Sequence, residues 1–140
     1  MEISLNWIAI CVVTLGFWIG GALWFGPIFG KIWMRIHHGE KKFTDEEMKN
    51  AAAGMWKLLV AELISNFVMV ATLAFLIAVL PSYSGMYLGF LVWIGFVLPT
   101  IVSSTIWGND SKKWMTPKIL ISASYRLIAL VAAGYVLGIW

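Results

Sequence analysis

Four long apolar stretches constrain this chain more than any other feature. They cover approximately residues 3–25, 55–80, 86–107 and 118–140, and few charged side chains interrupt them. A helix rises about 1.5 Å per residue, so about 20 residues cross the hydrocarbon core of a bilayer. Each stretch therefore predicts a transmembrane helix.

The composition agrees with a membrane location. Hydrophobic residues make up 61% of the 140 residues and charged residues 12%, whereas about a quarter of the residues in soluble domains are charged. In lipid, only helices and closed barrels satisfy every backbone group, and barrel strands would alternate apolar and polar residues. We therefore expect an all-α polytopic membrane protein with a single domain, 1–140, in which four transmembrane helices form a compact bundle.

Prolines and capping residues set the expected boundaries. Gly26-Pro27 predicts the end of the first span, and residues 81–85 predict a tight turn between the second and third spans. Pro99 is expected to kink the third span and to free the carbonyl of Gly95.

The second and fourth helices carry N-terminal signals. Thr44 with Glu47 matches a capping box, so the second helix is expected to begin near Asp45, ahead of the membrane. Thr116 and Pro117 predict the N-cap and first position of the fourth span.

Basic residues predict the orientation. The second loop and both chain ends contain no lysine or arginine, whereas the first and third loops contain Lys31, Arg35, Lys41, Lys42, Lys49, Lys112 and Lys113, with Lys118 at the edge. The positive-inside rule then predicts a multi-pass protein of the cell (inner or plasma) membrane, with loops one and three in the cytoplasm and both ends outside.

A short helix is expected directly after the first span. One helical face there carries the apolar residues Ile28, Phe29, Ile32, Trp33 and Ile36, and another carries Lys31 and Arg35. This pattern favours an interfacial amphipathic helix whose two cations contact anionic lipid headgroups, with an irregular loop as the alternative. We expect no nucleic-acid partner, because the basic residues flank the membrane.

Glu62 is a carboxylate inside the second apolar stretch, in the segment WKLLVAELISN. It lies about 8 Å on the cytoplasmic side of the midpoint of its span, and Arg126 lies about 5 Å on the same side of the midpoint of the fourth span. An arginine fork can hold a carboxylate through two hydrogen bonds. We expect a Glu62–Arg126 ion pair, or a water-filled pocket that both residues share.

Other polar residues fall at a similar depth and complete a predicted substrate or proton site: Asn66, Ser103, Ser104 and Ser122. Two interpretations remain open. In one, Glu62 accepts a proton or binds a cation, Arg126 neutralises it or holds an anion, and the protein binds or transports a small solute. In the other, the ion pair is architectural, and the protein is a non-transporting structural or interaction protein.

No motif for nucleophilic, zinc-dependent or phosphate-binding chemistry is present, so we expect no catalytic residue, no cofactor and no enzymatic activity. A membrane-embedded lipid-modifying enzyme is the alternative. His37, His38 and Glu40 are potential metal ligands. However, adjacent helical side chains point about 100° apart, and no third histidine stands nearby, so no metal site is expected.

Glycines recur at four-residue spacing in the pairs Gly16–Gly20, Gly26–Gly30, Gly85–Gly89 and Gly134–Gly138. Such pairs allow close helix approach, and we expect them to pack helices within the monomer more than across a dimer. A homo-oligomer is also expected, because four short helices bury only a small core.

The segment GALWFGPIFGKIW, residues 21–33, resembles the membrane family catalogued as domain of unknown function 1761. The matching positions are Trp24, Pro27, Gly30, Lys31 and Trp33, while Phe25 and Ile28 stand where tyrosine and leucine are usual. The segments TDEEMKNAAAG and SASYRLIALVAAGYVLG are also similar to that family. The resemblance implies a four-helix membrane architecture and no particular activity.

Overall fold

The computed structural model describes residues 2–39 and 41–140, which are mostly helical and contain no strand. Its elements are α1 (Trp7–Leu23), the π-helix η1 (Trp24–Ile28), α2 (Gly30–His38), α3 (Asp45–Val79), α4 (Gly85–Val92), the π-helix η2 (Trp93–Val97), α5 (Leu98–Ile106) and α6 (Lys112–Ile139). Four continuous segments are long and apolar enough to cross a membrane: Trp7–Ile28, Asp45–Val79, Gly85–Ile106 and Lys112–Ile139. The predicted all-helical class is confirmed, with four helices long and apolar enough to span a membrane.

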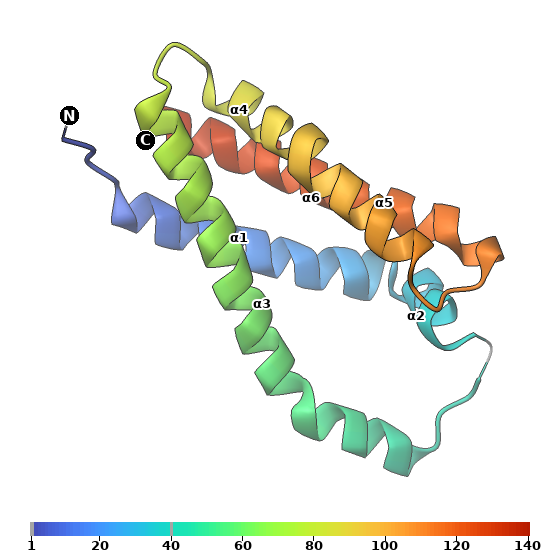
Figure 1. The fold of residues 1–140 in the computed structure, drawn as a ribbon. Helices are drawn as coiled ribbons and strands as arrows, with labels where there is room; N and C mark the ends of the chain where they lie inside the picture. The colour runs from blue at the N-terminus through green and yellow to red at the C-terminus, as the bar shows by residue number, and fades with distance from the viewer. Residues whose placement is uncertain (1, 40) are drawn as a thin grey trace.

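The helices are not packed equally closely. Figure 1 shows α6 running beside α4 and α5, with α1 near it, while α3 crosses α1 at a steep angle. Residues 45–62 of α3 are all exposed, so this half of the helix diverges from the others instead of joining a compact bundle. Both chain ends lie at one end of the molecule and α2 lies at the other.

The start of α3 agrees with the sequence, and the start of α6 does not. Thr44 Oγ1 accepts from the Glu47 amide at 3.2 Å while Glu47 Oε2 accepts from the Thr44 amide at 3.0 Å, so the predicted capping box is confirmed. In contrast, α6 begins at Lys112, and Pro117 lies inside it. The prediction of a cap at Thr116 is wrong, because the helix begins at Lys112 and continues through Pro117, whose missing amide costs it one hydrogen bond to the Lys113 carbonyl.

Two prolines are associated with π-helical turns. Pro27 lies in η1, where the Phe29 amide bonds to the carbonyl of Trp24 at 2.9 Å, five residues earlier. A wider turn accommodates the proline ring and the lost i to i−4 bond. The first span therefore continues through Gly26-Pro27, against expectation, and η2 ends two residues before Pro99 in the third span.

Glycines bring α4 and α6 into backbone contact. A Cβ on Gly85 would collide with the carbonyl of Gly134, and a Cβ on Gly89 would collide with that of Leu130. Packing within the monomer is thus confirmed for this seam. Gly16 and Gly26 differ, because a Cβ on either would meet open space.

Candidate functional site between α3 and α6

Arg126 joins α6 to α3 through two hydrogen bonds. Its Nη2 donates to Glu62 Oε1 at 2.9 Å, and its Nη1 donates to Asn66 Oδ1 at 2.9 Å. Glu62 and Asn66 are four residues apart, so their oxygens share one face of α3. The guanidinium therefore bridges two side chains of one helix, where the sequence suggested a two-bond grip on Glu62 alone. We refer to Glu62, Asn66 and Arg126 as the polar triad.

α1 supplies aromatic groups beside the polar triad. The Arg126 guanidinium carbon lies 5.4 Å from the centre of the Phe17 ring and 5.9 Å from that of Tyr125, within the range of cation–π attraction. Trp18 Nε1 donates to the carbonyl of Leu59 at 3.1 Å, one turn before Glu62. Three helices, α1, α3 and α6, therefore meet at this level.

Burial changes sharply across the polar triad. Asn66 is 2% exposed, whereas the side chains of Arg126 and Glu62 are 21% and 48% exposed. Arginine carries five N–H donors, and among the described residues two hydrogen bonds from Arg126 are found. The site is thus anchored at Asn66 and open at Glu62, on the side where α3 diverges.

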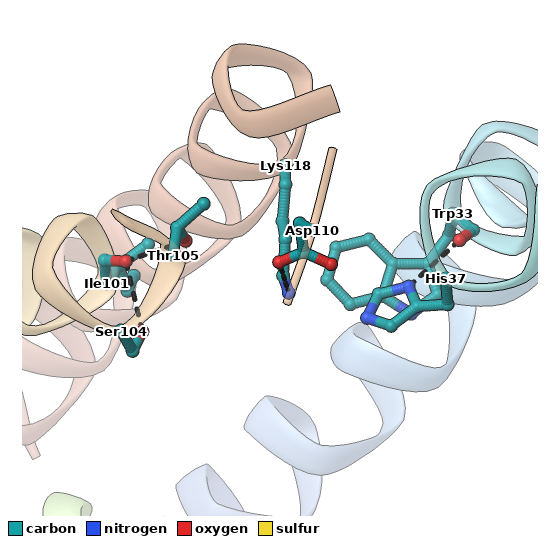
Figure 2. Close-up of polar contacts among 7 residues, drawn as sticks. All are labelled: Trp33, His37, Ile101, Ser104, Thr105, Asp110 and Lys118. Carbon is teal, nitrogen blue, oxygen red and sulfur yellow. Dashed lines mark hydrogen bonds and ion pairs between the residues drawn. The ribbon is translucent and has the colours of Figure 1, made fainter. Parts of the chain in front are cut away.

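The three predicted serines make no hydrogen bond to the polar triad within the described part of the chain. Figure 2 shows Ser104 on α5, whose Oγ donates to the carbonyl of Ile101 in its own helix at 3.0 Å. Ser103 is also exposed on α5, and Ser122 is partly buried on α6, one turn before Arg126. A serine in a helix readily bonds a preceding carbonyl, which removes the need for a partner on another helix. The role of these three residues stays a prediction.

Residues 8–138 match the family described as "Protein of unknown function (DUF1761)". The chain belongs to this family. No curated protein and no solved structure matches it. The match spans all four apolar helices and includes the polar triad, and the description of the family assigns no activity to them.

The DUF1761 motif of this chain builds the contact between η1 and α6. Trp24 Nε1 donates to the carbonyl of Ile121 at 3.0 Å, and the Tyr125 hydroxyl donates to the carbonyl of Phe17. A Cβ on Gly21 would lie 3.2 Å from the Tyr125 oxygen, so the glycine leaves room for the tyrosine. These contacts hold the part of α6 that carries Arg126 against η1 and α1.

The other motif positions shape the turn itself. Trp33 packs on Phe25 with ring centres 4.6 Å apart, and a Cβ on Gly30 would lie 3.2 Å from the carbonyl oxygen of Phe25. Lys31 is exposed, and Pro27 lies within η1. The motif thus serves as local architecture on the side of α6 next to the polar triad.

A second tryptophan, missed in the sequence, repeats this arrangement. Trp93 in η2 donates through Nε1 to the carbonyl of Ala123 at 2.9 Å, two residues from the carbonyl that Trp24 contacts. Each tryptophan opens a π-helix and is followed two residues later by glycine, and a proline comes three residues after Trp24 and six residues after Trp93. This repeated pattern is the signal that could have identified the pair.

An ion pair at the end remote from the chain termini was also missed. Lys118 Nζ lies 2.6 Å from Asp110 Oδ2, and both side chains are largely buried (Figure 2). The signal was Asp110, an acidic residue in an otherwise basic loop. Nearby, His37 bonds the carbonyl of Trp33 at 3.0 Å. No group of three potential metal ligands is found in residues 2–39 and 41–140, and Glu40 lies outside the described residues.

Proposed function

We propose that the polar triad is the binding site of a membrane protein that binds or moves a small solute or a proton. The observation that carries the proposal is the asymmetry of the site. Arg126 is anchored by the buried Asn66, while 48% of the Glu62 side chain is exposed. Ionisable groups within apolar spans are costly and commonly mark a solute or proton path, which supports a functional role here.

The geometry supports a coupled mechanism. With Glu62 ionised, its carboxylate occupies Nη2 of Arg126. Protonation of Glu62 removes its charge and weakens this bond, while Asn66 keeps Nη1 in place. The released N–H groups can then donate hydrogen bonds to a small anion. Proton binding at Glu62 and anion binding at Arg126 therefore favour each other.

An architectural role is the second candidate. It is favoured by the burial of Asn66 and by the stacking of Arg126 near Phe17, which together tie three helices. Under this function, the Glu62–Arg126 bond stabilises the helices and moves nothing. The two candidate functions differ in what the loss of the Glu62 carboxylate changes, which is proton flux for the first and stability for the second.

Proton flux separates the two candidates. The purified protein is reconstituted into liposomes that contain a pH-sensitive dye, a potassium diffusion potential is applied, and the internal pH is followed with and without added small anions. We expect Glu62→Gln to reduce flux to the leak of protein-free liposomes while the protein stays folded. Glu46→Gln removes an exposed carboxylate near the start of the same helix and is the matched control.

Thermal stability in detergent tests the architectural function. If wild-type flux equals the leak, and Glu62→Gln lowers thermal stability in detergent, the architectural function holds. In that case the exchanged variant Glu62→Arg/Arg126→Glu should recover part of the stability lost in Arg126→Glu alone.

A further inference from the structure

An open apolar groove runs between α1 and α6, and its lining includes Phe17 and Tyr125, whose rings also lie near Arg126. It has a volume of about 510 Å³. Val12 and Val136 line one end, and Trp24, Ile28 and Tyr125 line the other. The groove reaches roughly 16 to 24 Å along the two helices at 1.5 Å per residue, at least one leaflet of a bilayer.

The lining offers no free polar group within the described chain. Its two residues with polar atoms, Trp24 and Tyr125, donate to the carbonyls of Ile121 and Phe17. Small residues form much of the remainder: Gly16, Gly20, Ala129, Ala132 and Ala133. An occupant of this groove must therefore be apolar.

The length and the lining of the groove favour a hydrocarbon chain as its occupant. The lining is apolar over roughly 16 to 24 Å, so an extended acyl chain can follow the groove without burying an unpaired polar group.

Two cations follow the end of the groove that Ile28 lines. Lys31 comes three residues after Ile28, and Arg35 comes one turn after Lys31, so both lie on the same side of α2. Both are exposed, and within residues 2–39 and 41–140 neither forms a salt bridge, whereas Lys118 is already paired with Asp110. Among the described residues, no carboxylate therefore pairs with the two cations at this end of the groove.

We infer that the groove is a binding site for an anionic phospholipid, with one acyl chain between α1 and α6 and the phosphate at Lys31 and Arg35. Basic residues at the membrane surface attract anionic headgroups, and the apolar groove selects the chain. The inference does not rest on Glu62 or on the function proposed for the polar triad.

Native mass spectrometry of the detergent-purified protein tests the inference. Phosphatidylglycerol and phosphatidylcholine with identical acyl chains are titrated separately. We expect one saturable phosphatidylglycerol site. The double variant Lys31→Gln/Arg35→Gln should weaken phosphatidylglycerol binding roughly 25-fold, about fivefold per cation, and leave phosphatidylcholine binding within about twofold.

Filling the groove tests the acyl-chain half. A Cβ on Gly16 and one on Gly95 both meet open space, but only Gly16 lines the groove. Gly16→Leu should abolish saturable binding of both lipids, and Gly95→Leu should preserve it. Ala132→Leu, on the facing wall, gives the same test from α6.

Several outcomes would overturn the inference. They are an absence of saturable binding, unchanged binding in Gly16→Leu or Ala132→Leu, and unchanged phosphatidylglycerol affinity in the double variant. Unchanged phosphatidylglycerol affinity in Lys31→Gln/Arg35→Gln overturns the inference even if both groove variants fail to fold. Lys31 and Arg35 are exposed, so their replacement should leave the fold intact. Conversion of a dimer mass to a monomer mass by Gly16→Leu, without lipid loss, would assign the groove to a second copy of the chain.

Discussion

Arg126 is the residue on which most of the local order depends. It contacts α3 through Glu62 and Asn66 and lies near the ring of Phe17 in α1. The neighbouring Tyr125 adds a hydroxyl bond to the carbonyl of Phe17. Two adjacent residues of α6 therefore hold α1 and α3 in register.

The Tyr125 hydroxyl can be tested alone. Tyr125→Phe removes one buried hydrogen bond and keeps the ring, so we expect the free energy of unfolding to fall by about 1 kcal/mol. Tyr135→Phe, at an exposed position of the same helix, is the control and should change it by less than about 0.5 kcal/mol. Chemical unfolding in detergent micelles measures both, and equal effects would contradict the assigned bond.

The pair of residues in the site could be predicted from sequence, but its exact bonding could not. The depths of Glu62 and Arg126 follow from helix rise, because helical length is fixed per residue. The sharing of Arg126 between Glu62 and Asn66 depends on side-chain rotation, which spacing does not determine. The placement of Ser103 and Ser104 likewise depended on the rotation of α5 about its axis.

At the scale of the elements, the seam between α4 and α6 is the closest helix contact, because Gly85, Gly89 and Gly134 leave backbone against backbone. Gly89→Ala should lower the free energy of unfolding by about 1 to 3 kcal/mol through overpacking. Gly95→Ala, in the same span but facing open space, should change it by less than about 0.5 kcal/mol. Equal losses in the two variants, measured by chemical unfolding, would show that the seam is not tightly packed.

The sequence predicted that the four long helices exist, but it predicted their irregular turns only in part. Apolar length specified four spans, and Thr44 with Glu47 specified the start of α3. Pro27 and Pro117 were interpreted as boundaries, but both lie inside helical segments, Pro27 in a π-turn and Pro117 in the second turn of α6, where one hydrogen bond is lost. Pro99 was interpreted as a kink that frees the Gly95 carbonyl, which stays a prediction; the structure has the π-turn η2, which ends two residues before Pro99.

At the scale of the whole molecule, both chain ends lie opposite α2 and the basic loops. We propose that loops one and three are cytoplasmic, as the positive-inside rule predicts. In a Cys11→Ser background, a membrane-impermeant maleimide should label Ser82→Cys in intact cells and should label Lys42→Cys only after permeabilisation. The reverse pattern would place the chain ends in the cytoplasm and contradict this orientation.

The divergence of α3 is the feature of the whole molecule that gives the polar triad its open side. Residues 45–62 are exposed, and Glu62 is the last of them. The sequence indicated only part of this. The charged start of α3 was expected ahead of the membrane, but the mostly apolar residues 55–62 have the same composition whether they face lipid or a neighbouring helix.

The most direct test of the account is a double-mutant cycle between α3 and α6. The free energies of unfolding of the wild type, Glu62→Gln, Arg126→Gln and the double variant are measured in lipid bicelles. Because the pair is partly exposed, we predict a coupling energy of about 1 kcal/mol, with the double variant less destabilised than the two single losses added. Additivity within about 0.3 kcal/mol would mean that Glu62 and Arg126 do not interact, and it would contradict the account.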